Sequence, residues 1–418
     1  MHLAAAVGAL RVRNFRLFWV SQVVSGTGTW MQVVAVSWLV LDISHSSPTA
    51  LGTITFIQFL PMMLLSLPAG VLVDRVSKRR LLIGTQTAAM AQASTLAALV
   101  ALHDARLWTV ALLALLLGTV NALNNPTQQA FVPDLVPKHL VSDAVALNSA
   151  QFNASRMVGS ALGGIAVATI GMTSTLIINA ATFALPILAL FTMRRRELLH
   201  SPETAHKRGS VELHEGIRYV FRTPPVLAVI GLLAVIGTLG FNWQVVAPLL
   251  ARIVLHHGAI GFGLLLSAMA AGSLVGAATL TFARTPSERR LVVAGVSLGL
   301  CLIALGISTS YPVSVALMAL AGLAGGMFSV SANSRLQLLS PPRLRGRIMS
   351  FYVLLMGGST PIGGFLLGQA AAQLGVGTAV WLFGAVCVLL VFVVAVIRRA
   401  AMAPQPIEPS NSPIEPRA

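Results

Sequence analysis

The sequence carries very little charge for its length. Only 10% of its 418 residues are Asp, Glu, Lys or Arg, whereas 56% are hydrophobic. A typical soluble domain is about 25% charged, and a soluble fold with so little charge would expose large apolar patches. Apolar runs of roughly 20 residues, long enough to cross the hydrocarbon core of a bilayer, recur along the whole chain. The composition therefore excludes an ordinary soluble protein and predicts an integral membrane protein.

Acidic residues and cysteines are scarce as well. Twelve Asp and Glu stand against 28 Lys and Arg, which gives a formal net charge of +16. The basic residues form short clusters without interleaved aromatic residues, so we expect no nucleic-acid partner. Cys301 and Cys387 lie inside apolar runs without metal-ligand spacing, which favours a packing role. The sequence shows no nucleotide-binding loop, metal cluster or nucleophile elbow, so we expect neither an enzyme nor an ATP-driven pump, and no cofactor.

The apolar runs predict an all-α membrane protein with twelve transmembrane helices. The expected spans are 15–41, 49–73, 81–103, 107–127, 143–170, 174–193, 225–250, 260–282, 291–309, 313–337, 348–372 and 377–397. The polar stretch 194–222 separates spans six and seven, and its part from Val211 to Phe221 has the pattern of an amphipathic helix on the membrane surface. The proline-rich tail, 400–418, is expected to be disordered.

The basic residues lie almost entirely on one side of the expected spans. With the N-terminus inside, the segments on the other side hold only Arg106 and Arg252. Cytoplasmic loops of membrane proteins carry an excess of Lys and Arg. This asymmetry predicts an even number of spans with both termini in the cytoplasm.

Short motifs recur about half a chain apart. The three pairs are Asn125…Gln129…Pro133 with Asn333…Gln337…Pro341, Ala161-Leu-Gly-Gly164 with Pro361-Ile-Gly-Gly364, and Arg79-Arg80-Leu81 with Arg289-Arg290-Leu291. Internal repeats of this length are typical of transporters built from two related halves. We therefore predict two six-helix halves, 1–193 and 223–399, joined by a cytoplasmic linker at 194–222.

The loop between spans two and three carries a family resemblance. Gly70-Val-Leu-Val-Asp74-Arg75-Val-Ser-Lys78-Arg79-Arg80 resembles the signature loop of the major facilitator superfamily, with Ser77 in place of its second glycine. Glu215-Gly-Ile-Arg-Tyr-Val220 and Leu344-Arg-Gly-Arg347 resemble its transmembrane secretion effector branch, which includes the enterobactin exporter and macrolide-efflux proteins. The resemblance implies that Asp74 latches the cytoplasmic side in the outward-facing state. The alternative is that the loop, including Arg75 and Arg79, only anchors the chain by its positive charge.

A glycine motif in span five offers a second candidate for gating. Gly159-Ser-Ala-Leu-Gly163-Gly164 is similar to the antiporter motif of drug exporters, with Ser160 in place of its usual proline. By this resemblance it forms a bendable interface between helices that rock. Close packing of small residues would explain the same glycines without a gating role.

Polar side chains inside the spans are the candidate substrate contacts. By resemblance, spans one, four, seven and ten line the central cavity of the family. The candidates on these spans are Gln22, Ser25, Thr29, Gln32, Asn125, Asn242, Asn333 and Arg335. The first four fall on one helical stripe. A hydrogen bond between helices is the competing interpretation for each of them.

Arg156 in span five is the most distinctive of the buried polar residues. An arginine within reach of the hydrocarbon core needs a partner or water, so it is either a substrate anchor or part of a structural pair. Acidic residues and histidines are missing from the middle of the spans; Asp42, at the outer end of span one, is the candidate for ion coupling. This absence makes a cationic substrate less expected than a neutral or anionic one.

The sequence as a whole predicts a secondary transporter in the inner membrane of a bacterial cell. We expect it to export a neutral or anionic hydrophobic small molecule, siderophore-like or macrolide-like, by alternating access with proton coupling. Its partners would be the substrate and the lipid bilayer, and we expect a monomer. An importer of the same fold and a non-transporting receptor or scaffold are the alternatives.

Overall fold

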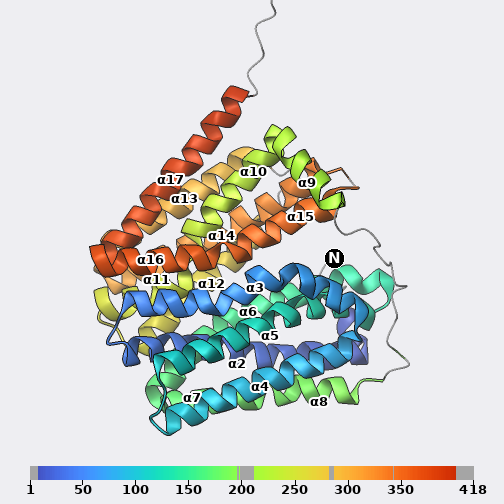
Figure 1. Cartoon of the computed structure of the whole chain (residues 1–418), viewed down its shortest axis with the longest axis vertical. Coiled ribbons are helices and arrows are strands. Elements are labelled where there is room, and N and C mark those ends of the chain that lie inside the picture. Colours follow the sequence, from blue (N-terminus) through green and yellow to red (C-terminus); the bar gives the residue numbers. More distant parts are fainter. Residues whose placement is uncertain (1–7, 195–196, 198–210, 282–286, 342, 402–418) are drawn as a thin grey trace, which may run out of the picture.

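The computed structural model describes residues 8–194, 197, 211–281, 287–341 and 343–401, and within these ranges every regular element is a helix. The helices form two groups, α2–α8 and α10–α17, which lie against each other (Figure 1). At helical positions 66–71, 74, 211–214, 216, 281 and 398–401 only the backbone is described. The tail from 402 onwards, for which disorder is predicted, and linker residues 195–196 and 198–210 lie outside the described residues.

The first group follows the first six expected spans. Its elements are α2 (Arg13–Ile43), α3 (Pro48–Arg75), α4 (Lys78–Ala101), α5 (Leu107–Phe131), η1 (Val132–Leu135), η2 (Lys138–Leu140), α6 (Val141–Thr169), α7 (Gly171–Thr182) and α8 (Ala184–Thr192). Ser47 and Pro48 start α3, where the Ser47 hydroxyl accepts a hydrogen bond from the Ala50 N–H. Serine is a favoured N-cap and proline a favoured first helical residue, so this start is encoded locally.

The second group contains the remaining six expected spans and the amphipathic helix before them. Its elements are α9 (Val211–Arg222), α10 (Pro224–Val235), η4 (Ile236–Gly240), α11 (Trp243–Leu249), η5 (Leu250–Val254), α12 (Ala259–Thr281), α13 (Glu288–Ile307), α14 (Tyr311–Leu339), α15 (Arg345–Val353), η6 (Leu354–Gly358), α16 (Thr360–Leu374) and α17 (Val376–Ala401). The elements η4, η5 and η6 are π-helical turns. Each expected span coincides with one continuous or interrupted helical segment.

Ten of these segments are long and apolar enough to cross a membrane, counted within the part of the chain that the structure describes. The helices α4 and α6 fall short of that hydropathy, although they are 24 and 29 residues long. Both carry polar residues, among them Gln86 and Gln92 in α4 and Gln151 and Arg156 in α6. Polar side chains are tolerated at membrane depth where they face the interior of a bundle, and these four do so, as the cavities below show.

Glycine ends two corresponding helices in the same way. Gly171 follows α6 and Gly375 follows α16, and both have φ near +85°. That backbone conformation suits glycine because it has no Cβ. The matching turns support the predicted internal repeat, because they join the fifth and sixth helical segments of each group.

The two groups meet along two pairs of helices. In the first pair α6 packs on α12, and in the second α3 packs on α16. An apolar core of buried residues runs through both groups and includes Leu41, Leu51, Phe262 and Phe328. A smaller core around Phe15, Phe18 and Phe131 lies within the α2–α8 group. The remaining space between the groups contains the cavity described next.

Candidate functional site

A cavity of about 410 Å³ lies between the two groups of helices; we call it the central cavity. Its wall on the α2–α8 side has many polar side chains, whereas the α10–α17 group contributes Gln244, Met356, Gly357 and Thr360. The polar residues on the first wall are Thr29, Gln32, Ser37, Thr55, Gln58, Gln92, Asn121, Asn125 and Arg156. Apolar side chains such as Phe59 and Met62 fill much of the remaining surface. The cavity therefore suits a largely apolar molecule with a few polar groups.

A smaller cavity of about 100 Å³ adjoins the central cavity; we call it the polar pocket. The two share Thr29, Trp30, Leu117, Asn121, Asn125 and Phe152. The other polar side chains of the pocket are Gln22, Ser25, Thr85, Gln86, Asn124, Gln128, Gln151 and Ser155. All of its lining belongs to the α2–α8 group, so a molecule in the central cavity has a polar extension on that side only.

Arg156 lies in the wall of the central cavity beside an aromatic pair. Its Nη2 donates a hydrogen bond to Asn153 Oδ1 at 3.3 Å, and its guanidinium carbon is 5.9 Å from the centre of the Trp30 ring. The Trp30 and Phe152 rings meet edge to face at 6.2 Å. Arg156 Nε has no hydrogen-bond partner, and none of the ion pairs of the described residues includes this side chain. Arg156 therefore lies where the expected substrate anchor would lie, and its guanidinium has N–H donors that remain available to a ligand.

The polar stripe of α2 divides into two environments. Gln22, Ser25 and Thr29 line the polar pocket, whereas Gln32 lines the central cavity. Gln32 is also fixed between helices: its Oε1 accepts from Asn179 Nδ2 of α7, and its Nε2 donates to Gln92 Oε1 of α4 at 3.1 Å. Asn125 of α5 lines both cavities. These residues and Arg156 are thus brought together as candidate contacts, and Gln32 has a structural role beside it.

The three candidates from the α10–α17 group lie outside both cavities. Asn242 is buried and donates to the Thr238 carbonyl at 2.7 Å. Asn333 accepts from Gln337 Nε2 one turn later in α14. Arg335 forms an ion pair of 3.8 Å with Glu288 at the start of α13. An interaction between helices, the competing interpretation of these residues, is therefore what the structure shows for Arg335, whereas Asn242 and Asn333 bond within their own helical segments.

Sequence reasoning missed the polar residues of α4 and several in α3. Thr85 and Gln86 line the polar pocket, and Gln58 and Gln92 line the central cavity. The expectation that spans one, four, seven and ten form the cavity left out spans two and three, where these residues lie. The glutamines themselves were a signal in the sequence, because glutamine is rare inside an apolar span and tends to face the bundle interior.

The glycines of α6 mark two different contacts. A Cβ added at Gly159 would come within 2.5 Å of the Thr27 carbonyl oxygen, and one at Gly163 within 2.8 Å of Met31 Cα, both in α2. A Cβ at Gly164 would instead come within 2.5 Å of the Ala259 carbonyl oxygen of α12, in the other group. Gly159 and Gly163 therefore allow α6 to pack closely on α2 of its own group, and Gly164 allows it to pack closely on α12 of the opposite group.

A matching arrangement occurs in α16. A Cβ at Gly363 would overlap the Thr238 carbonyl oxygen of η4, within the same group. A Cβ at Gly368 of α16 would come within 2.7 Å of the Pro48 carbonyl oxygen of α3. A Cβ at Gly52 of α3 would come within 2.8 Å of the Gly364 carbonyl oxygen of α16. Close backbone approach through small residues is the usual way helices associate in membranes. Both contact surfaces between the groups thus depend on glycine.

Polar contacts join the groups at the end of the bundle that holds the turns 44–47 and 255–258; we call it the far end. Arg252 of η5 forms an ion pair with Asp42 and donates from Nε to the Ser46 hydroxyl at 2.9 Å. Its guanidinium carbon lies 4.9 Å from the Trp38 ring centre, and Trp38 stacks on Phe262 of α12 at 6.5 Å. Asp42, the candidate for coupling, is therefore bound across the two groups.

At the opposite end, which holds Arg194 and α9 and which we call the linker end, basic residues bind helix ends. Lys78 pairs with Asp134 at 2.7 Å, and Arg79 donates to the carbonyl oxygens of Leu190 and Phe191 at the end of α8. Cations favour helix C-termini, where carbonyl groups are unsatisfied. Arg75 is exposed. Only the backbone is described at Gly70 and Asp74, so the latch stays a prediction.

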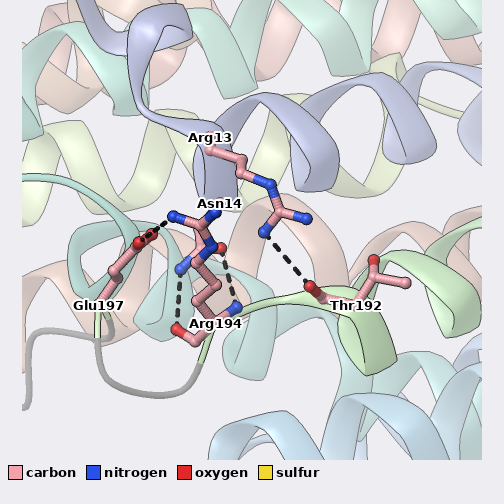
Figure 2. Close-up of polar contacts among 5 residues, drawn as sticks. All are labelled: Arg13, Asn14, Thr192, Arg194 and Glu197. Carbon is pink, nitrogen blue, oxygen red and sulfur yellow. Dashed lines mark hydrogen bonds and ion pairs between the residues drawn. The ribbon is translucent and has the colours of Figure 1, made fainter.

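The start of the linker is tied to α2 (Figure 2). Asn14, which is buried, donates to the Arg194 carbonyl at 3.1 Å and accepts from the Arg194 N–H at 3.2 Å. Arg13 donates to the Thr192 carbonyl at 3.4 Å, and Arg194 pairs with Glu197 at 2.9 Å. The first and last helices of the α2–α8 group are thereby fixed to each other at the linker end.

Two groups of membrane helices around a shared central cavity define a membrane transporter of the major facilitator type. Residues 4–416 match the transmembrane secretion effector family, and the chain belongs to that family. It is accordingly a transporter and not an enzyme, as the sequence predicts.

Curated relatives and solved structures agree with this assignment. The chain is 26% identical over 383 residues to the multidrug efflux pump Tap of Mycolicibacterium fortuitum, covering 89% of this chain and 92% of that protein. It is 26% identical over 256 residues to the staphyloferrin A transporter of Staphylococcus aureus, covering 59% and 62%. The structure resembles a POT family transporter in complex with 5-aminolevulinic acid, with a TM-score of 0.75, 13% identity and coverage of 93% and 97%. It also resembles the nucleoside transporter NupG, with a TM-score of 0.73, 12% identity and coverage of 92% and 98%.

Proposed function

We propose that this transporter exports a neutral or anionic hydrophobic small molecule by alternating access, coupled to a proton gradient. The observation that carries the proposal is the central cavity, where Arg156 is the charged residue of the wall and no Asp, Glu or His appears among the lining residues. A cation in this cavity would meet a positive charge without a carboxylate to bind it, whereas an anion or a carbonyl group would find a donor.

Export is favoured over import by the relatives. The Tap protein is named as a multidrug efflux pump, and its match covers most of both chains. The match to the staphyloferrin A transporter keeps siderophore-like molecules among the candidate substrates, beside macrolide-like compounds. We propose the orientation that the basic residues predict, with the linker end and both termini in the cytoplasm.

Contacts between the two groups support a proposal for how the two access states differ. The groups are joined at the far end through Arg252, Asp42 and the glycine contacts of α6 and α16. We propose that these contacts close the periplasmic side when the cavity faces the cytoplasm, and separate when it faces outward. Asp42 then acts in a gate, and its exposure to the periplasm in the open state makes it the candidate for proton coupling. Asp74 would act in the opposite sense at the linker end.

Everted membrane vesicles provide the test of direction. In these vesicles the cytoplasmic face is outside, so a proton-coupled exporter should accumulate its substrate when the lumen is acidified. A panel of neutral, anionic and cationic hydrophobic compounds, compared between vesicles with and without the protein, identifies what is moved. Accumulation only in right-side-out vesicles would indicate the importer, and absence of gradient-linked flux for every compound would favour the receptor or scaffold.

A further inference from the structure

The polar pocket differs in chemistry from the central cavity that it joins. Its polar lining consists of amides and hydroxyls, and no acidic or basic side chain is among its lining residues. Amide groups both donate and accept hydrogen bonds, as hydroxyl groups do. A carboxylate or an ammonium group would find only partial compensation there, because each needs partners of one kind. The pocket therefore suits a neutral group that donates and accepts.

Several polar side chains of the pocket wall are hydrogen-bonded within the protein. Gln151 Nε2 donates to the Gln22 carbonyl at 2.9 Å and to the Ser155 hydroxyl at 3.1 Å. Asn124 Oδ1 accepts from the Thr85 hydroxyl at 3.0 Å and from Gln86 Nε2 at 3.4 Å. These bonds fix the side chains of α4, α5 and α6 around the pocket before a ligand binds.

Among the residues that line the pocket, Gln86 is the one with a fully buried polar atom that lacks a partner. It is only 3% exposed, yet its Oε1 has no hydrogen-bond partner. Exchanging the amide oxygen and nitrogen of both Gln86 and Asn124 preserves their mutual bond but leaves the Gln86 nitrogen unpaired instead, so one polar atom remains unpaired in either assignment. Buried polar groups normally have a partner, and an unpaired one is costly. A ligand group that enters the pocket beside Gln86 would supply that partner.

The dimensions of the two cavities divide the ligand into two parts. The pocket, at about 100 Å³, takes one small head group, whereas the central cavity, at about 410 Å³, takes a larger apolar body. Trp30 and Phe152 line both cavities, so the two parts of one molecule would lie on either side of the same aromatic pair.

We propose that the transported molecule is an amphiphile that places a hydroxyl- or amide-bearing neutral head in the polar pocket, with Gln86 as the residue that selects it. Its apolar body occupies the central cavity, and any carbonyl or anionic group on that body lies toward Arg156. This inference rests on the proposed function, because it names the class of substrate for the same site.

The test uses two fluorescent probes that differ only in the head. Each has a dansyl group on an alkyl chain, ended by a primary carboxamide in one and by an isopropyl group of similar size in the other. Binding is measured by energy transfer from tryptophan to dansyl, with the full chain in lipid nanodiscs free of sugar-based detergent. The wild-type protein should bind the carboxamide probe about tenfold more tightly, because a site built for hydrogen bonds rejects a head that lacks them.

Substitutions of Gln86 test whether the preference for the polar head arises in the polar pocket. Gln86→Leu should bring the affinity ratio of the two probes close to one. If Gln86→Leu does not fold, Gln86→Met, whose side chain has nearly the same length as glutamine, replaces it in the measurement. The matched control is Gln373→Leu, at an exposed position near the end of α16, which should leave the ratio unchanged. Equal affinities in the wild type, or an unchanged ratio in both Gln86 variants, would overturn the inference.

The same probes separate this inference from the proposed function. Uptake of both probes into everted vesicles without a preference for the carboxamide head would support export and refute the role of Gln86. A Gln86-dependent preference in nanodiscs without gradient-linked flux of either probe would support the polar pocket and refute the transport proposal.

Discussion

In the α2–α8 group, the first and fifth helices, α2 and α6, run without interruption for 31 and 29 residues. Their counterparts in the other group are broken: η4 and η5 interrupt the segment 224–254, and η6 interrupts 345–374. π-Helical turns are rare and frequently occur at functional sites. Corresponding helices of the two groups thus occupy equivalent places in the order of spans, but those of the α10–α17 group are less regular.

The two groups also differ in polarity around the central cavity. The α2–α8 group supplies Arg156, the amides of α2–α5 and the whole polar pocket. The other group supplies two polar side chains, Gln244 and Thr360, beside Met356 and Gly357 of the π-helical turn. We infer that the first group determines which molecule binds, and that the second group, with its irregular helices, changes shape around the bound molecule. The predictions below test this division.

The largest effect is expected where glycine holds the irregular group together. Gly363→Ala would drive a methyl group into the Thr238 carbonyl oxygen, so α16 and η4 must separate. Overpacking of this kind destabilises a protein by about 3 kcal/mol. Membrane abundance and the melting temperature of the purified protein should fall. Gly84→Ala in α4, where an added Cβ meets nothing within 4 Å, is the control. Equal melting temperatures for both variants would contradict the contact.

Loss of the charged cavity residue should abolish function without loss of the fold. Arg156→Ala removes the donors that face the central cavity, so transport into everted vesicles should drop at least about tenfold, as expected when a charged hydrogen bond to a ligand is lost. Membrane abundance should stay unchanged. Arg106→Ala, at an exposed position at the far end, serves as the matched control. Normal transport by Arg156→Ala would show that Arg156 has only a structural role.

A moderate effect is expected at the gate between the groups. Arg252→Ala or Asp42→Asn removes the ion pair that joins η5 to α2, and exposed pairs contribute up to about 1 kcal/mol. A cysteine at Val40, with Cys301 and Cys387 replaced, should react several-fold faster with an impermeant thiol reagent added from the far end. Asp104→Asn, in an exposed pair within one group, is the control. Unchanged reactivity in both gate variants would contradict a closing role.

The smallest effect is expected on the second wall of the cavity. Thr360 lines the central cavity, but its hydroxyl donates within its own group, to the Met356 carbonyl at 3.2 Å. Thr360→Ala should therefore change the apparent affinity for a transported compound less than about twofold, within the usual range of surface-like substitutions. The change in apparent affinity should be measured for Thr360→Ala and Arg156→Ala side by side. Changes of equal size would mean that both groups of helices select the substrate.

The sequence predicts the fold well because its strongest signal is hydrophobic length. All twelve expected spans coincide with helical segments, and the recurrence of Gly163-Gly164 as Gly363-Gly364 corresponds to matching contacts in α6 and α16. The irregular turns η4, η5 and η6 were not predicted, because no residue pattern distinguishes a π-helical turn from regular helix in an apolar run. These turns depend on contacts between helices far apart in sequence.

The candidate site was predicted less completely. Gln22, Thr29, Asn125 and Arg156 do line the cavities, because polar residues in a span tend to face inward. Facing inward is not the same as facing the cavity, and Asn242 instead hydrogen-bonds within its own helical segment. Rotation of each helix about its axis is set by packing, which a single sequence does not reveal.

One measurement tests the central claim, that the α2–α8 wall with Arg156 selects against cations. Two dansyl amphiphiles of equal length, one ending in a carboxylate and one in a quaternary ammonium group, are offered to everted vesicles with an acidified lumen. The account predicts protein-dependent accumulation of the carboxylate probe, its loss in Arg156→Ala, and no protein-dependent accumulation of the ammonium probe. Protein-dependent accumulation of the ammonium probe with Arg156 intact would contradict it.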